Sequence, residues 1–172
     1  MSASQIELKQ EVTRKDALTI IAWMKDNEIT KYLNESVDII YELQRAIERV
    51  NMIILTHLFN NQGSFYLIYS YNTEPVGFLK LVKKPKETEM VIVIGDKQRW
   101  GNGLGKASIK KGLEIAFFQW RASHVIAKID PNNIRSIRVF ENVGFKLVNE
   151  YQSMRVYSLS LDNFVKKLTK GI

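Results

Sequence analysis

The spacing of apolar residues divides the chain into short elements. Period-two alternation and short apolar runs predict strands, at residues 6–12, 64–71, 76–82, 89–95, 124–129, 146–151 and 154–161. Apolar residues three and four positions apart predict helices, at residues 14–25, from Ser36 or Asp38 to about Asn61, at 103–121, from Asn132 or Asn133 to 143, and as a short or frayed end at 162–170. The order β-α-α-β-β-β-α-β-α-β-β predicts a mixed α/β (α+β) fold.

Residues at the predicted boundaries support these assignments. Thr13 is a good N-cap for the helix over residues 14–25, and Asn133 for the helix that ends at Val143. Gly144 then ends that helix as a C-cap. Residues 27–35 are predicted to form a turn between the first two helices.

A glycine-rich segment joins a predicted strand to a predicted helix. It reads Gln98-Arg99-Trp100-Gly101-Asn102-Gly103-Leu104-Gly105-Lys106. A helix start leaves several backbone N–H groups unpaired, and the helix dipole adds partial positive charge there. Because glycine lets a bulky anion approach the backbone, this segment predicts a phosphate or pyrophosphate site.

Other interpretations of the glycines fit less well. A P-loop requires Ser or Thr after Gly-Lys, but Ala107 follows Lys106 and Trp100 occupies the place of the first glycine. A dinucleotide-binding fingerprint has Lys106 or Ser108 where its last glycine belongs, although Asp130 imitates the ribose-binding acid. The antiparallel strands predicted before the loop weaken that interpretation. A structural turn that binds nothing remains an alternative.

Composition excludes several kinds of site. The 172 residues include no Cys and two His, so disulfides, thiolate zinc sites and cysteine nucleophiles are excluded, and no metal is expected. Hydrophobic residues at 45% and charged residues at 25% are typical of a soluble globular protein, and the length favours a single domain over residues 1–172. Neither a signal sequence nor a membrane-spanning run is present, which predicts a cytoplasmic protein without a membrane partner.

The formal net charge of +7 raises the question of a nucleic-acid partner. Lys and Arg are scattered along the chain, however, and no nucleic-acid-binding module is recognisable. We therefore expect no nucleic acid partner. A basic surface also suits a ligand that carries several phosphates.

Two linked motifs resemble the GNAT superfamily of N-acetyltransferases. Trp100-Gly-Asn-Gly-Leu-Gly-Lys106 resembles the coenzyme A pyrophosphate loop of that family, R/Q-x-x-G-x-G/A, in the variant found among ribosomal-protein alanine acetyltransferases and spermidine acetyltransferases. Residues 130–145, Asp-Pro-Asn-Asn-Ile-Arg-Ser-Ile-Arg-Val-Phe-Glu-Asn-Val-Gly-Phe, resemble the second hallmark of that branch, and residues 23–33 its substrate-side helix and turn. The resemblance covers nearly the whole chain.

This resemblance implies the GNAT acyl-CoA acyltransferase fold and acetyl transfer from acetyl-CoA to a primary amine. The acceptor would be a polyamine, an aminoglycoside, another small amine, or a peptide or protein N-terminus, and the enzyme a monomer or homodimer. A non-catalytic acyl-CoA sensor or adaptor of the same fold is the alternative. Acidic residues of the acceptor side are expected at Glu28, Asp38 and Glu42.

The resemblance also assigns residues to the cofactor. The strand residues Val93, Ile94 and Gly95 would pair with the pantetheine arm, and one backbone N–H there, with Gly95 well suited, would polarise the acetyl carbonyl. A strand-ending turn explains Gly95 equally well. The pyrophosphate loop comprises Trp100, Gly101, Asn102, Gly103, Leu104, Gly105 and Lys106. Asn133 would cap its helix, bind the cofactor arm, or do both, and Phe140 would lie near the sulfur.

Acetylation of an amine also requires a proton acceptor, because an alkylamine with a pKa of about 10.4 is almost entirely protonated at neutral pH. Glu89 is the first candidate and Glu35 the second, while an exposed carboxylate beside Lys86 would explain Glu89 without a catalytic role. Many family members have Tyr at the position of Phe140, where its hydroxyl protonates the leaving thiolate. Phe140 cannot do so, and water or another tyrosine, Tyr32 or Tyr157, would replace it.

Overall fold

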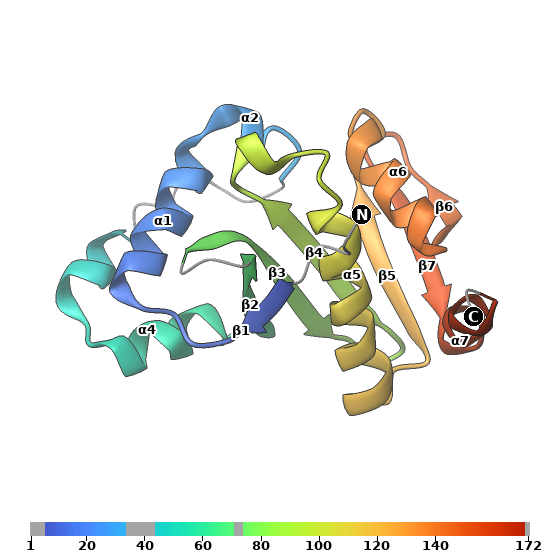
Figure 1. Cartoon of the computed structure of the whole chain (residues 1–172), viewed down its shortest axis with the longest axis horizontal. Coiled ribbons are helices and arrows are strands. Elements are labelled where there is room, and N and C mark those ends of the chain that lie inside the picture. The colour runs from blue at the N-terminus through green and yellow to red at the C-terminus, as the bar shows by residue number, and fades with distance from the viewer. Residues whose placement is uncertain (1–5, 34–43, 71–73, 171–172) are drawn as a thin grey trace.

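Seven strands form one sheet within residues 6–33, 44–70 and 74–170, the part of the chain that the computed structural model describes. The spatial order is β1-β2-β3-β4-β5-β7-β6, and only the β4–β5 pair is parallel among the strand pairs of this part. The strands are β1 (Ile6–Lys9), β2 (Ser64–Ser70), β3 (Pro75–Lys83), β4 (Thr88–Ile94), β5 (His124–Ile129), β6 (Lys146–Glu150) and β7 (Arg155–Ser160) (Figure 1). The mixed α+β fold expected from the sequence is confirmed.

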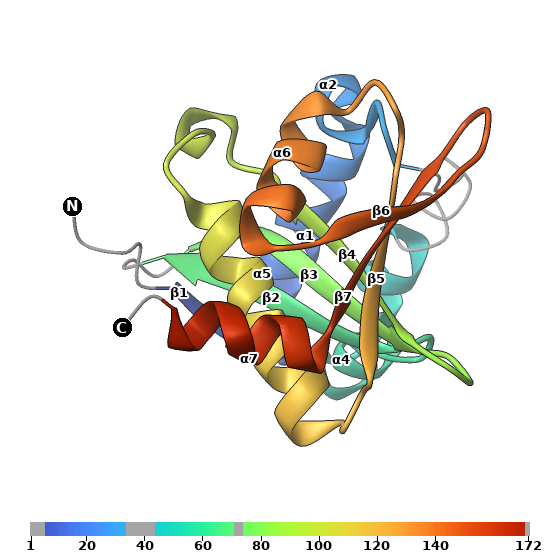
Figure 2. The ribbon, with the colours of Figure 1, turned by 90° about the vertical axis from the view of Figure 1, so that its right-hand side faces the viewer.

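Helices cover both faces of this sheet (Figure 2). They are α1 (Arg14–Lys25), α2 (Asn27–Thr30), α4 (Met52–Phe59), α5 (Leu104–Glu114), α6 (Ile134–Val143) and α7 (Leu161–Thr169). The protein has one hydrophobic core on each face of the sheet, because successive side chains of a strand point to opposite faces. On β2, Phe65 and Leu67 belong to the core on the α1 side, whereas Tyr66 and Ile68 belong to the core that contains α5, α6 and α7. The sheet is therefore the middle layer of three.

Side-chain caps set the starts of α1 and α6, the two helices whose starts were predicted most accurately. The Thr13 side chain accepts from the Asp16 backbone N–H at 3.2 Å, and the Asp16 carboxylate accepts from the Thr13 N–H at 2.9 Å. This capping box starts α1 where the sequence predicted it. At α6, Asn133 Oδ1 accepts from the Ser136 N–H at 3.1 Å, and Gly144 ends the helix with a φ of 120°.

Three predicted boundaries were wrong. The helix expected to continue to Asn61 is interrupted, because Asn51 Oδ1 accepts a hydrogen bond from the Ile54 N–H at 3.1 Å and starts a new helix, α4. Before this interruption, residues 44–49 are helical. The expected start of the helix, at Ser36 or Asp38, lies outside the described residues. The strand expected over residues 6–12 ends at Lys9. The predicted turn at 27–35 begins with α2, which Asp26 caps. The helix after the glycines extends close to its predicted end, and its last part, Ile115–Gln119, is a π-helix.

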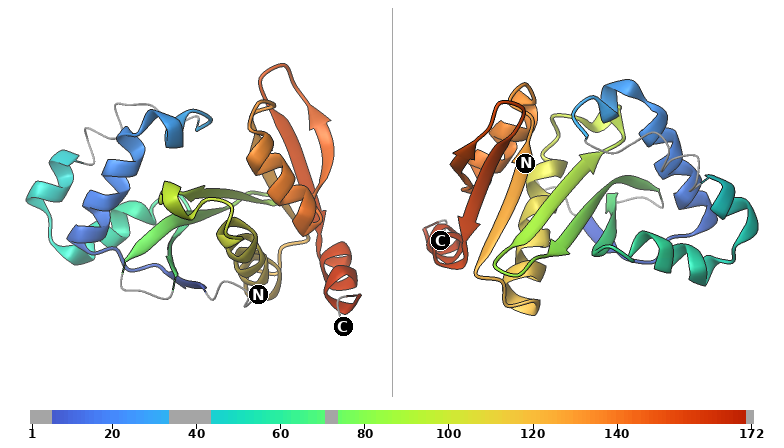
Figure 3. Two further views of the ribbon diagram at one scale, coloured as in Figure 1. Left: turned by 45° about the horizontal axis from the view of Figure 1, so that its top comes forward. Right: turned by 180° about the vertical axis from the view of Figure 1, so that it is seen from behind.

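Strands β4 and β5 pair only at one end. The register joins Thr88 to Val125 and Glu89 to Ile126, whereas β4 continues to Ile94. On its other side β4 stays paired with β3 as far as Ile94. The edge of residues 90–94 that faces β5 is therefore left without a neighbouring strand, and the two halves of the sheet diverge, as the left view of Figure 3 shows.

Gly95 ends β4 in a tight position. Its N–H donates to the Val76 carbonyl oxygen at 2.9 Å, and the Asp96 N–H donates to the same oxygen at 3.1 Å. A Cβ atom at Gly95 would lie 2.1 Å from Cδ2 of Trp23 on α1. Because the Trp23 ring is buried in the core between α1 and the sheet, this strand end admits only glycine.

In the described part of the chain, no helix has the length and apolar character needed to cross a membrane.

The close approach of Gly95 to Trp23 predicts how a substitution at Gly95 changes the stability of the fold. Gly95→Ala should lower the free energy of unfolding by about 1–3 kcal/mol, because the added methyl group overlaps a packed indole ring. Urea denaturation measures this change. Gly105→Ala is the matched control: its Cβ would have its nearest neighbour, Val139 Cγ1, at 3.6 Å, so its stability should change by no more than about 0.5 kcal/mol. Equal stability of the two variants would contradict the packing argument.

Candidate active site

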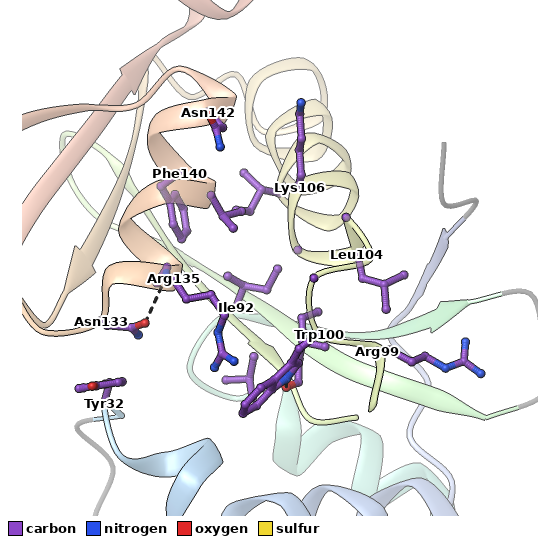
Figure 4. Close-up of a pocket in the computed structure, with 18 of the residues that line it drawn as sticks. Tyr32, Ile92, Arg99, Trp100, Leu104, Lys106, Asn133, Arg135, Phe140 and Asn142 are labelled. Atoms are coloured by element: carbon purple, nitrogen blue, oxygen red, sulfur yellow. Dashed lines mark hydrogen bonds between the residues drawn. The ribbon is translucent and has the colours of Figure 1, made fainter. Parts of the chain in front are cut away.

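A cavity of about 330 Å³ opens where β4 and β5 separate (Figure 4). Its floor is residues 92–94 of β4, one wall is the glycine-rich segment with the start of α5, and the other wall is α6. Ile29 of α2 and the residues that follow this helix, Tyr32 and Leu33, complete the described lining. Three sequence segments that lie far apart in the chain therefore meet at one site.

The glycine-rich segment brings uncapped backbone N–H groups to this cavity. Gly101 and Gly103 have φ angles of 82° and 77°, in the left-handed region that glycine adopts without strain. Gly103 is the N-cap residue of α5 and offers no side-chain hydrogen bond to the helix. The other described α-helices are capped by side chains, from Thr13, Asp26, Asn51, Asn133 and Ser160. The N–H groups at the start of α5 are thus available to an anionic ligand.

Cationic side chains add to the positive potential of the cavity. Arg99, Lys106 and Arg135 line it, and none of its described lining residues is Asp, Glu or His. Arg99 forms an ion pair with Asp96 at 3.1 Å. A site with this charge distribution favours a ligand that carries phosphates.

Trp100 holds the glycine-rich segment against β4. Its indole Nε1 donates to the Ile94 carbonyl oxygen at 2.8 Å. On the ring face, the guanidinium carbon of Arg135 lies 3.5 Å from the ring centroid. Trp100 was expected in the loop, whereas Arg135 was not expected at the site. The available signal was its position two residues after Asn133, in the first turn of α6.

Of the residues assigned to the cofactor, ten line the cavity. They are Val93, Ile94, Trp100, Gly101, Gly103, Leu104, Gly105, Lys106, Asn133 and Phe140. Asn133 also caps α6, so the structural role expected for it is present. Phe140 is 2% exposed and packs edge-to-face against Phe145 with ring centroids 4.9 Å apart, so its ring is part of the core as well as of the cavity wall.

Asn102 and Gly95 are not among the lining residues of this cavity. The Gly95 N–H, expected to polarise an acetyl carbonyl, already donates to the Val76 carbonyl oxygen, and the absent side chain makes room for Trp23. The alternative explanation of Gly95, a strand-ending turn, fits these contacts better.

Glu89 lies at the closed end of the β4–β5 pair and does not line the cavity. Its carboxylate contacts the ammonium groups of Lys84 at 2.5 Å and Lys128 at 3.2 Å. Burial raises the pKa of Glu89, but the hydrogen bonds from the two lysines outweigh burial and lower it overall. These contacts do not favour Glu89 as a proton acceptor, since Ile92, the nearest lining residue of β4, is about 10 Å further along the strand.

Glu35, the second candidate, lies outside the described residues, as do Asp38 and Glu42. Leu33, two residues before Glu35, lines the cavity. Of the two tyrosines considered as proton donors, Tyr32 lines the cavity, whereas Tyr157 on β7 is 2% exposed within the core. No group of three or more His, Asp or Glu that could hold a metal ion occurs in the described ranges.

Known proteins resemble this chain in sequence and in fold. An uncharacterised N-acetyltransferase, p20, from Bacillus licheniformis is 23% identical over 158 residues, which cover 86% of this chain and 87% of that protein. A spermidine N-acetyltransferase from Vibrio cholerae, solved with coenzyme A and spermine, has a TM-score of 0.73 at 17% identity, covering 94% and 99% of the two chains. An aminoglycoside acetyltransferase solved with coenzyme A and kanamycin has a TM-score of 0.74 at 15% identity, covering 95% and 99%.

The family comparison covers most of the chain. Residues 8–146 match the family described as an acetyltransferase (GNAT) domain. This range contains β4, the glycine-rich segment, α5 and α6, the elements that build the cavity. The chain therefore belongs to the GNAT family of acetyltransferases.

Proposed function

We propose that this protein transfers an acetyl group from acetyl-CoA to a primary amine. The observation that carries the proposal is the cavity at the β4–β5 divergence, where an uncapped helix start, an unpaired strand edge and cationic side chains converge. Each of these features matches a part of coenzyme A. Acetyl-CoA supplies an acetyl group activated as a thioester.

The described residues fit coenzyme A in three ways. The N–H groups at the start of α5, with Lys106 beside them, would hold the pyrophosphate, because charge-assisted hydrogen bonds to phosphate are strong. Gly101 faces open space, with no atom beyond its chain neighbours within 4 Å of the place that a Cβ would take, so a bulky anion can approach the backbone there. The backbone edge of Val93 and Ile94 would pair with the amide groups of the pantetheine arm.

The acceptor amine must lose a proton before it attacks the thioester. We assign the proton acceptor to Glu35 in preference to Glu89. Glu35 follows the lining residue Leu33 closely in sequence, whereas the Glu89 carboxylate is paired with two lysines. Tyr32, which lines the cavity, would donate a proton to the leaving thiolate in place of Phe140. The related proteins act on polyamines and aminoglycosides, which are primary amines of the class proposed here.

A non-catalytic acyl-CoA sensor is a second candidate. It is favoured by the lack of Asp, Glu or His among the described lining residues and by Phe140 at the position of a family acid. The two functions differ in one measurement. With acetyl-CoA labelled in its acetyl group, an acetyltransferase moves label to a panel of amines, and a sensor binds coenzyme A without transfer.

The proposed pyrophosphate site can be tested without straining the backbone. Gly105→Glu places a carboxylate at the start of α5, where no clash is present and negative charge favours the helix. Repulsion from phosphate should weaken coenzyme A binding by about a hundredfold or more in calorimetry. Gly105→Ala is the control for size alone and should lose much less affinity. Unchanged affinity of Gly105→Glu would show that the loop does not hold the cofactor.

A second test compares the two carboxylates. Glu35→Gln should lower kcat by about tenfold or more and remove the acid limb of the pH profile, with coenzyme A affinity unchanged. Glu89→Gln should leave kcat within about twofold. A normal rate for Glu35→Gln together with a large loss for Glu89→Gln would reverse the assignment.

The same Glu89 variant should show a stability effect with a defined pH dependence. Because the folded-state pKa of Glu89 is lowered, its ion pairs stabilise the protein above the unfolded-state pKa of about 4.5. This contribution is lost as the pH falls through the folded-state pKa. Urea denaturation should therefore find Glu89→Gln less stable than the parent protein at pH 7, with the difference shrinking towards pH 3. A constant difference would contradict the ion-pair explanation.

A further inference from the structure

Arg135 crosses from α6 to the glycine-rich segment at one end of the cavity. Its guanidinium carbon lies 3.5 Å from the centroid of the Trp100 ring, and Trp100 is itself fixed by its hydrogen bond to the Ile94 carbonyl oxygen. Figure 4 shows the Arg135 side chain extending over β4 towards Trp100. Stacking on a fixed indole ring therefore holds the guanidinium plane in a defined orientation.

The stacked guanidinium has no acceptor of its own in the described part of the chain, where it forms neither a hydrogen bond nor an ion pair. Partial burial lowers the pKa of Arg135, and the field of Glu28 opposes this effect. Glu28, however, is bound to the ammonium group of Lys97 at 2.9 Å. Because stacking occupies a face of the guanidinium plane, the N–H donors along its edge stay open to an incoming anion.

Arg135 reaches the glycine-rich segment at Trp100, one residue before the backbone N–H groups proposed to hold the pyrophosphate. Figure 4 shows Lys106 on α5 at one end of the cavity, and Arg135 with Asn133 and Tyr32 towards the other end. Tyr32 belongs to the segment after α2, which also lines the cavity through Leu33. The start of α5 and Lys106 already supply donors for the pyrophosphate, and Tyr32 and Leu33 belong to the segment that resembles the substrate side of the family, which together favour an anion of the second substrate as the partner of Arg135.

We propose that Arg135 is a specificity-determining residue that binds a carboxylate of the acceptor, so that the preferred acceptors are amines that also carry a carboxylate, such as amino acids or short peptides. This inference rests on the proposed acetyl transfer and names its substrate class. A planar fork of donors binds a carboxylate bidentately. The same guanidinium repels a second ammonium group, which disfavours polyamines as acceptors.

Binding can be measured without turnover. The arginine Nε–Hε NMR signals of the protein saturated with coenzyme A are followed during titration with matched pairs: lysine and cadaverine, tyrosine and tyramine, histidine and histamine. Each pair differs by one carboxylate. The Arg135 signal, assigned by its loss in Arg135→Gln, should shift with the amino acids and stay still with the decarboxylated amines.

Acetylation kinetics test the same pairs. For the amino acids, Arg135→Gln should lower kcat/KM by about tenfold or more, mainly through KM, because a charge-assisted bidentate contact is lost. For tyramine and histamine, kcat/KM should stay within twofold, and for the diamine cadaverine it should stay the same or rise, because the repulsion of its second ammonium group is removed. Arg138→Gln is the matched control, since Arg138 is an exposed arginine on the same helix that does not line the cavity, and it should behave as the parent protein.

Any of three results would overturn the inference. The Arg135 signal could show no shift that depends on the carboxylate, or the parent protein could prefer the decarboxylated amines. Alternatively, Arg135→Gln could lose affinity for coenzyme A while its preference among acceptors stays unchanged. The last result would assign Arg135 to a cofactor phosphate. Failure of the parent protein to bind coenzyme A would instead contradict the proposed function. The two proposals can therefore fail separately.

Discussion

The divergence of β4 and β5 is the constraint on which the rest of the structure depends. The two strands share a register at Thr88 and Glu89 and then separate, so a strand edge lies open in the middle of the sheet rather than at its border. Open edges at a border invite pairing with other chains. Here α5 and α6 pack against each other over the opening, which restricts access to ligands that fit a cavity.

This arrangement costs stability at the site and recovers it around the site. An unpaired strand edge, an uncapped helix start and several nearby cations are each unfavourable without a ligand. The closed end of the strand pair compensates, because Glu89 on β4 bridges Lys84, which follows β3, and Lys128 on β5. The edge-to-face contact of Phe140, near the C-terminal end of α6, with Phe145 also adds stability beside the site. Glu89 is thus well explained as a structural residue.

Local patterns predicted the elements, and caps predicted their ends. The caps predicted at Thr13 and Asn133 were correct, because an N-cap hydrogen bond joins residues that are only three positions apart in the sequence. The long helix before β2 was wrong for a related reason: its apolar stripe continues past Asn51, and the pattern does not reveal that the Asn51 side chain bonds to the backbone and restarts the helix. The glycine-rich segment was predictable because its chemistry lies within one short motif.

What sequence reasoning missed depends on contacts between distant residues. Glu89 meets Lys128, and Arg135 meets Trp100; neither pair has a spacing that a periodic pattern can express. Gly95 was assigned a role in polarising a carbonyl because the explanation for its missing side chain, Trp23, lies on another element.

The contact between Gly95 and Trp23 also constrains how related sequences can change. One residue fills the space that the other leaves empty, so neither position can vary freely by itself. A side chain at the position of Gly95 is accommodated best beside a smaller residue at the position of Trp23, and reducing the ring first avoids the destabilised intermediate. The end of β4 and the first helix are therefore inherited as a pair, although half the fold separates them along the chain.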